Sequence, residues 1–400
     1  MTARSKPTVS TSKPVESPWL YAMLALLGTA GFFYVNLAAA FVDGLVGRLG
    51  YSHAQAGEVL SANIYGASVG GLIAVFLVRR WAWRPMMLGL LLALLVIELV
   101  CTQVASYTVL LPLRALNGLL GGAEVGIALA LLARTRLPDR AFGALLVFQF
   151  TFGGFGSWLL PGVMEQHGTW VLFACLAAMD VAALVVAAML RMPATTVDDQ
   201  AHDASAGGNH AVWLLPLALL ALFLFQAANM GLFAFIIPLG EASALTLPFI
   251  SQTVGWTTWI GTLGAVLVIA FGTQLGRARP LLAAMLLTLV CIAGLYWSAH
   301  KGVFFASNAG SAITWSFVVP YLFGIVAWLD RSGRLATLAG FVSGLGLASG
   351  PLFAGWVAEE ANFAPMISLS LVFFGAAMVA MLVAAARVDR MDKSLIQSEV

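Results

Sequence analysis

The feature that most constrains this chain is a series of apolar runs of about twenty residues that show no alternation of polar and apolar positions. A helix of this length crosses the hydrocarbon core of a bilayer and satisfies its own backbone hydrogen bonds there. With 61% apolar and 10% charged residues and a mean hydropathy of +0.94, the chain has too little polar surface to coat a water-soluble globule. We therefore expect a helical membrane protein and exclude an outer-membrane barrel.

The apolar runs form two sets of six, which occupy 18–191 and 212–387. Between them lies one long polar stretch, 192–211, whose Pro, Gly, Ser and Asp content is typical of a flexible cytoplasmic linker. Cytoplasmic tails are expected at 1–17, which we interpret as disordered and not as a signal peptide, and at 388–400. The predicted fold is an all-α membrane protein of twelve transmembrane helices in two six-helix pseudo-symmetric bundles.

Basic residues set the orientation, because Lys and Arg are retained on the cytoplasmic side of a membrane. With both termini inside, only Arg48 and Lys301 of the basic residues between the spans fall outside. We expect a multi-pass protein of the cytoplasmic (inner) membrane with both termini in the cytoplasm.

The two sets of runs repeat each other. The stretch from Arg79 to Pro85 and the stretch from Gln274 to Pro280 are both short basic turns that end in Arg-Pro. Glycine-rich segments also occur at matching places in the fifth and eleventh runs, where they let helices approach closely. Such repeats are common in transporters, with the substrate site at their interface. On these grounds we assign gating or packing roles to Arg84, Gly276, Arg277, Arg279, Gly350 and Pro351.

These motifs resemble those of the major facilitator superfamily over nearly the whole chain. Gly276-Arg277-Ala278-Arg279 is similar to the family's Gly-Arg-rich loop, although the usual acidic neighbour is absent. Arg114 followed by Gly118, Gly121 and Gly122 resembles the fourth-helix motif, and the segment from Gly346 to Pro351 resembles the glycine-proline motif of the family's antiporters, although it stands in helix eleven. The resemblance implies two rocking bundles, with helices one, four, seven and ten around a central cavity.

The fourth run carries a charged face. Arg114, Asn117, Gly121 and Glu124 follow at i, i+3, i+7 and i+10, which at about 100° per residue places them within an arc of roughly 80°. Arg114 can hold an anionic substrate or tune a proton-shuttling carboxylate, or it can form a buried pair with Glu98 in the third run. The sequence leaves both interpretations open.

Acidic residues within the spans are candidates for proton coupling, because a buried carboxylate can load and release a proton. Glu124 is the first choice, and Asp43 and Glu58 are further candidates that can equally be interfacial charges. Glu98 and Asp180 lie in helices that the resemblance places on the outside, so direct roles for them are less favoured.

Polar and aromatic residues also line up in the second set, which has no ionisable residue inside a span. Together with the polar residues of the first set they give the candidate substrate-binding residues Asn36, Arg114, Asn117, Gln226, Asn229, Gln252, Trp256, Asn308, Ser311 and Trp315. Core packing is the alternative for the tryptophans.

The function predicted is secondary active transport of a small organic solute, anionic or aromatic, with protons as the coupling ion. Alternatives are a multidrug efflux antiporter, a passive facilitator, or a non-transporting receptor on a transporter fold. We expect no enzyme activity, cofactor, metal or nucleic-acid partner, because the five histidines are scattered over loops and Cys101, Cys175 and Cys291 are small core residues. A monomer in the lipid bilayer is expected.

Overall fold

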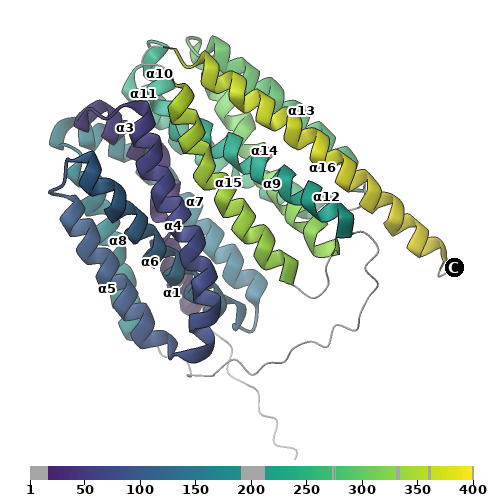
Figure 1. Cartoon of the computed structure of the whole chain (residues 1–400), viewed down its shortest axis with the longest axis horizontal. Coiled ribbons are helices and arrows are strands. Elements are labelled where there is room, and N and C mark those ends of the chain that lie inside the picture. The colour runs from purple at the N-terminus through teal and green to yellow at the C-terminus, as the bar shows by residue number, and fades with distance from the viewer. Residues whose placement is uncertain are drawn as a thin grey trace, which may run out of the picture.

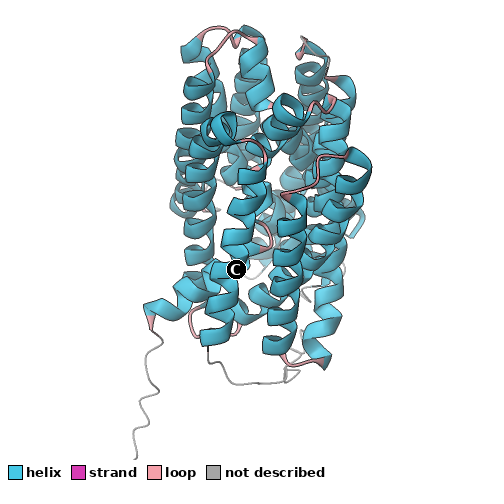
Figure 2. Ribbon diagram, turned by 90° about the vertical axis from the view of Figure 1, so that its left-hand side faces the viewer, coloured by secondary structure: helices cyan, strands magenta, loops and turns pink. Residues whose placement is uncertain are grey.

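The structure is a computed structural model that describes residues 17–190, 212–272, 274, 276–329, 334–358 and 362–398. Most of the predicted tail at 1–17 and all of the predicted linker at 192–211 lie outside these residues. Every regular element within the described ranges is a helix (Figure 2). Eleven helices are long and apolar enough to cross a membrane, and the shorter apolar helix Pro18–Ala30 begins the first crossing.

The N half contains the helices α1 to α8. Their bounds are α1 Pro18–Ala30, α2 Phe33–Asn36, α3 Ala38–Leu49, α4 His53–Arg80, α5 Trp83–Cys101, α6 Tyr107–Ala133, α7 Pro138–His167 and α8 Trp170–Met189. The C half begins after the linker. Its elements are η1 Val212–Leu214, α9 Leu215–Ala234, α10 Ile236–Ala242, α11 Leu247–Ile260, α12 Thr262–Phe271, α13 Ala278–Gly294, η2 Leu295–Trp297, α14 Lys301–Leu329, α15 Arg334–Val357 and α16 Ala364–Ser398.

Local sequence signals explain where the helices begin. Ser52 and Gln55 form a reciprocal capping box at the start of α4, with Gln55 N donating to Ser52 Oγ at 3.2 Å and Ser52 N donating to Gln55 Oε1 at 3.1 Å. Proline stands in the first turn of α1, α7, α9 and α11, where its missing N–H costs nothing. Gly50 ends α3 with a positive φ of 70° that glycine adopts without strain.

The first crossing of each half is broken. In the N half the chain leaves helical geometry between α1 and α2 and again at Leu37, and in the C half it does so at Phe235 between α9 and α10. The sequence predicted one continuous span in each case. Breaks at corresponding places support the expected pseudo-symmetry.

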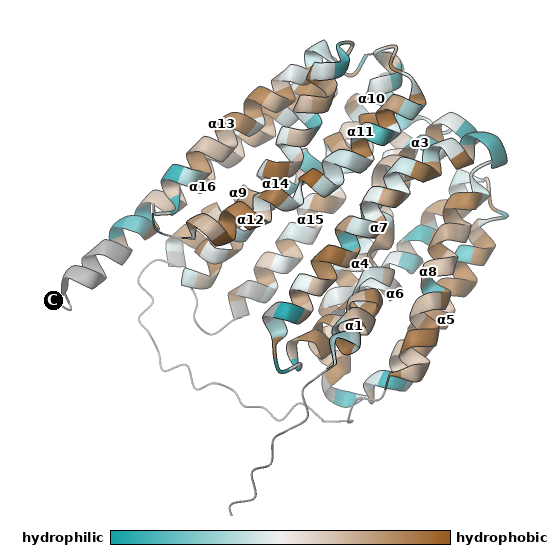
Figure 3. Ribbon diagram, turned by 180° about the vertical axis from the view of Figure 1, so that it is seen from behind, coloured by the Kyte–Doolittle hydropathy of each residue, from teal (hydrophilic) through white to brown (hydrophobic). Residues whose placement is uncertain are grey.

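Hydropathy follows the outside of the bundle. In Figure 3 apolar residues cover the outward-facing helices α5 and α13, and polar residues gather near the helix ends. Exposed large apolar side chains such as Val96, Leu99, Ile269 and Val290 belong to this outer surface. Because a lipid-facing surface needs no polar coat, the distribution agrees with a membrane protein.

The last helix is longer than predicted. α16 continues to Ser398, through most of the segment that the sequence analysis assigned to a C-terminal tail. Asp389 of this extension accepts hydrogen bonds from Arg277 N and Ala278 N, all at 2.9 Å. The extension is thereby tied to the start of α13.

The two halves lie side by side and are joined by α4 with α15 and by α7 with α11 (Figure 1). The linker side of the bundle is defined by the end of α8 and the start of α9, and Arg84 Nη2 donates to Ala188 O there. On the opposite side α4 and α15 touch, because a Cβ added at Gly57 would clash with the carbonyl oxygen of Pro351. Their ends on the linker side lie farther apart in Figure 1.

Candidate functional site

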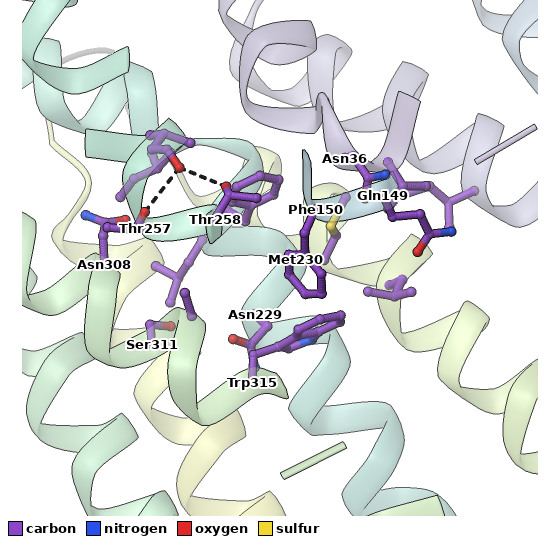
Figure 4. A pocket seen from close by; sticks show the side chains of 18 of the residues that line it. Asn36, Gln149, Phe150, Asn229, Met230, Thr257, Thr258, Asn308, Ser311 and Trp315 are labelled. Carbon is purple, nitrogen blue, oxygen red and sulfur yellow. Dashed lines mark hydrogen bonds between the residues drawn. The ribbon is translucent and has the colours of Figure 1, made fainter. Parts of the chain in front are cut away.

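A central cavity of about 330 Å³ lies between the halves and receives side chains from both (Figure 4). The N half contributes residues of α2, α4 and α7, and the C half contributes residues of α9, α10, α11, α13, η2, α14 and α15. The polar part of the lining consists of Asn36, Ser68, Gln149, Asn229, Thr257, Thr258, Ser307, Asn308, Ser311 and Trp315. None of the described lining residues is ionisable.

Five of the ten predicted substrate-binding residues line this cavity: Asn36, Asn229, Asn308, Ser311 and Trp315. Asn229 Nδ2 donates to Phe225 O at 3.0 Å and Asn308 Nδ2 donates to Phe304 O at 2.8 Å, each within its own helix. Asn36 Nδ2 is buried and has no hydrogen-bond partner among the described residues.

Trp315 is held in place by Gln226, a predicted binding residue that does not itself line the cavity. Trp315 Nε1 donates to Gln226 Oε1 at 2.8 Å, and Gln226 Nε2 donates to Ser343 Oγ at 2.8 Å. The ring of Phe150, from α7 of the N half, lies 6.5 Å from that of Trp315 in an edge-on arrangement. The two rings therefore face the cavity from opposite halves, with Trp315 fixed from behind.

The charged face of α6 does not line the cavity. Arg114 is fully buried, and its Nη1 lies 2.7 Å from Glu98 Oε1 of α5. Asn117 Nδ2 donates to the same oxygen at 2.9 Å. With its amide oxygen turned toward the guanidinium, Asn63 of α4 accepts from Arg114 Nη2 at 2.6 Å and from Nε at 2.9 Å. The buried pair with Glu98, one of the two interpretations from the sequence, is thus present.

Aromatic rings complete the surroundings of Arg114. The rings of Tyr34, Phe41 and Phe173 lie 5.3 to 5.9 Å from its guanidinium carbon. A guanidinium enclosed by a carboxylate, amides and ring faces has little room for a solute anion.

Glu124 lies next to the break in the first crossing. It is fully buried, its Oε2 accepts from Gly31 N at 3.2 Å, and its Oε1 has no hydrogen-bond partner among the described residues. Gly31 directly precedes Phe32, which lines the cavity. Only glycine fits at this position, because a Cβ would lie 2.6 Å from Glu124 Oε2 and would clash with Gly121 O. One residue therefore separates this carboxyl group from the cavity wall.

The other predicted proton-coupling residues lie toward the side opposite the linker. Asp43 is buried in α3, and its Oδ2 has no hydrogen-bond partner in the described part of the chain. Glu58 of α4 accepts from Tyr107 Oη and, at 3.0 Å, from Trp356 Nε1 of the C half. Tyr65 Oη and Ser349 Oγ form a second bond between the halves at 2.7 Å.

Gln252 and Trp256 of α11 do not line the cavity, because both side chains are exposed on the outer face of the bundle. The predicted gating residues lie where helices meet or turn. Gly350 packs against Ala227 O, Pro351 against Gly57, and Gly276 adopts a φ of 73° at the turn before α13. Arg277 Nη1 lies 3.6 Å from Asp389 Oδ1, whereas Arg279 is exposed.

Several lining residues were missed by the sequence analysis. Gln149 and Phe150 of α7, Ser68 of α4, and Thr257 and Thr258 of α11 were not proposed. They lie on the second, fifth and eighth membrane crossings, which the family resemblance did not name as lining the cavity. Gln149 was detectable as an isolated amide inside an apolar run.

Comparison with known proteins identifies the fold. No sequence-family model and no curated protein sequence matches the chain. A mutant form of the nucleoside transporter NupG superposes with a TM-score of 0.74 at 12% identity, over 92% of this chain and 99% of that chain. A structure from work on proton-dependent oligopeptide transporters gives 0.70 at 16% identity, over 92% and 96%. A D-xylose-proton symporter gives 0.67 at 13% identity, over 93% and 97%.

This chain has the fold of the major facilitator superfamily transporters. The predicted fold class, a membrane protein of two six-helix bundles, is confirmed. Neither the solute nor the coupling ion follows from likeness at this level of identity.

Proposed function

We propose that this protein is a proton-coupled secondary transporter that carries a small organic solute through the central cavity by alternating access. The observation that carries the proposal is the composition of the cavity, whose polar and aromatic side chains come from both halves. A site shared by two rigid bundles changes its accessibility when one bundle rocks against the other. The neighbours in fold are described as transporters of nucleosides, oligopeptides and xylose, which supports a solute of that size.

The contacts between the halves support one defined state of this cycle. His53 of α4 lies 5.8 Å from the ring of Phe235 and 5.2 Å from that of Phe363, both in the C half. With Glu58–Trp356 and Tyr65–Ser349, these contacts join the halves toward the side opposite the linker. If the linker and both termini are cytoplasmic, as the basic residues favour, this state is closed to the outside. We place the protein in the cytoplasmic membrane on the same argument.

Glu124 is the proposed coupling acid. A charge at the bilayer centre costs at least about 2.5–3.5 kcal/mol, and no cation contacts this carboxyl group in the described residues. The protonated form therefore suits the state described here. Release of the proton would place a charge beside Gly31 and change the first crossing at its break, one residue from the cavity.

Arg114 has a structural role in this proposal. Its pair with Glu98 joins α5 to α6, and Asn63 joins the same cluster to α4. An anion would have to displace Glu98 to reach the guanidinium. Binding of anionic solutes through Arg114 is therefore not part of the proposed mechanism.

The test is flux in proteoliposomes that contain the purified full chain. A metabolite panel is first screened for compounds that raise the unfolding temperature, since a molecule that binds the native state stabilises it by mass action. Uptake of each such compound is then measured with and without an imposed pH gradient. Accumulation that needs the gradient supports the proposal. Equilibration without dependence on the gradient would indicate a passive facilitator, and binding without flux would indicate a receptor.

A further inference from the structure

We propose that the central cavity selects an uncharged solute with a flat, largely apolar body that carries both hydrogen-bond donors and acceptors. The inference rests on the proposed transport function, because it names the class of solute that the same cavity would carry. It replaces the anionic solute that Arg114 suggested in the sequence.

The wall of the cavity offers no counter-charge. Of the described residues that line it, none is Asp, Glu, Lys, Arg or His. An ion that enters such a space loses its hydration without gaining an opposite charge, and that loss is large. An uncharged polar group loses less, since amides and hydroxyls of the protein replace its bonds to water. The composition of the wall therefore discriminates against ions of either sign.

The buried charges nearby are already engaged. Arg114 is paired with Glu98 at 2.7 Å and enclosed by aromatic rings. Glu124 accepts the N–H of Gly31 and is separated from the wall by the main chain at Phe32. Neither group lines the cavity, so neither lies in contact with a molecule bound there.

The polar groups of the cavity wall indicate which hydrogen-bonding groups the solute carries. Asn229 and Asn308, in the C half, each use one Nδ2 hydrogen within their own helices, which leaves the second hydrogen to donate and the carbonyl oxygen to accept. A solute that contacts α9 and α14 can therefore use both hydrogen-bond donors and acceptors. Figure 4 shows Asn36 across the cavity from Asn229 and Asn308.

Aromatic side chains define its body. Trp315 cannot swing freely, because its indole N–H is bonded to Gln226 Oε1 at 2.8 Å. Phe150 packs edge-on against it, with 6.5 Å between ring centroids, and holds the indole from the side of α7. A planar apolar body can pack against a fixed indole at low entropic cost, because the protein group is already ordered.

The experiment measures thermal stabilisation of the purified full chain by a panel of metabolites of similar size that are uncharged, anionic or cationic at pH 7. The panel includes one matched set that shares a skeleton: indole-3-acetamide, indole-3-acetate and tryptamine. Stabilisation that is lost in Trp315→Ala and kept in Gln252→Leu is assigned to the cavity, because Gln252 is exposed on the outer face of α11. Each compound assigned in this way is then titrated for its Kd.

We expect the cavity-dependent compounds to be uncharged, and a charged analogue of each to bind at least tenfold more weakly. Asn308→Asp should shift the preference toward cations, because it places a carboxylate in the wall. Cavity-dependent binding of anions or cations by the unaltered chain, as tight as that of uncharged analogues, would overturn the inference and leave the transport function standing. Cavity-dependent binding of tryptamine that disappears in Glu124→Gln would overturn it too. If no compound of any charge binds in the cavity, both the inference and the proposed function fail.

Discussion

The indole nitrogen of Trp356 on α15 lies 3.0 Å from the carboxylate oxygen Oε1 of Glu58 on α4, so a hydrogen bond joins the two halves of the molecule on the side away from the linker. The same carboxylate accepts from Tyr107 Oη of its own half. The bond is present only when that side is closed. Its removal should therefore favour the state in which that side is open.

Trp356→Phe keeps an aromatic ring but cannot donate this bond. We expect the ratio of open to closed molecules to rise about fivefold, which corresponds to about 1 kcal/mol for one partly exposed bond to a carboxylate. The measurement is labelling of a cysteine introduced at Ser68 with a membrane-impermeant thiol reagent added from outside, in a chain whose three cysteines have been replaced by alanine. Trp170→Phe is the matched control, because Trp170 Nε1 donates to His167 O within one half. Equal labelling in both variants would show that the hydrogen bond between Glu58 and Trp356 does not stabilise the closed state.

The pair of Arg114 and Glu98 predicts a pattern of stabilities. Arg114→Met should destabilise the protein by about 3–5 kcal/mol, because Glu98 is left as an uncompensated buried charge. Arg114→Met combined with Glu98→Leu should recover most of that loss. Thermal unfolding in detergent measures the stability of both variants. The single variant Glu98→Leu completes the double-mutant cycle.

The same cycle separates the two interpretations of Arg114. If the arginine is structural, the double variant keeps cavity-dependent binding. Loss of binding in a variant at Arg114 that unfolds at the temperature of the unaltered chain would instead identify Arg114 as a ligand for the solute.

A substitution at Gly31 tests whether Glu124 is coupled to the cavity. Gly31→Ala places a methyl group 2.6 Å from Glu124 Oε2 and into Gly121 O, so the broken first crossing must shift. We expect a loss of stability of about 1–3 kcal/mol and weaker solute binding. Gly89→Ala is the control, because nothing lies within 4 Å of its Cβ. Stability and binding unchanged in Gly31→Ala would contradict the close approach seen at this position.

Gln226 positions Trp315 without lining the cavity. Gln226→Leu removes the acceptor of the indole N–H and should weaken solute binding about tenfold, or about 1.4 kcal/mol. Titration of a compound identified in the metabolite screen gives the Kd. The matched change Gln252→Leu, on the outer face of α11, should leave the Kd unaltered. If both changes altered the Kd equally, Gln226 would have no specific role in positioning Trp315.

Hydropathy was sufficient to predict the helical membrane fold because each span satisfies its own backbone and must match the bilayer. The breaks at Leu37 and Phe235 were not predictable in this way. Both are ordinary apolar residues, so the hydropathy and periodicity of the sequence carry no signal for a break at either position.

The charged face of α6 shows what helical periodicity can and cannot predict. It placed Arg114, Asn117 and Glu124 on one face of the helix, and all three are buried. Periodicity says which residues share a face but not what that face meets. Here it meets α5 at Glu98 and the first crossing at Gly31, and not the cavity. Trp256 shows the same limit, since its amide neighbour Gln252 shares its face and that face is exposed.

Asp389 was missed for a related reason. The Gly-Arg-rich turn before α13 lacks an acidic neighbour in sequence, which put its role in doubt. The structure supplies the carboxylate from the far end of the chain, where Asp389 accepts from Arg277 N at 2.9 Å. Only a contact over 112 positions could reveal it.

The most direct test of the account is concentrative uptake by proteoliposomes under an imposed pH gradient, compared between the unaltered chain and Glu124→Gln. The compound is one whose binding depends on Trp315. The account predicts that the unaltered chain accumulates the compound, and that Glu124→Gln no longer does so but still exchanges it across the membrane at equal pH, because the cavity is intact and only the proton carrier is lost. Accumulation that is undiminished in Glu124→Gln would contradict the proposed coupling. Absence of any flux in the unaltered chain would contradict transport itself.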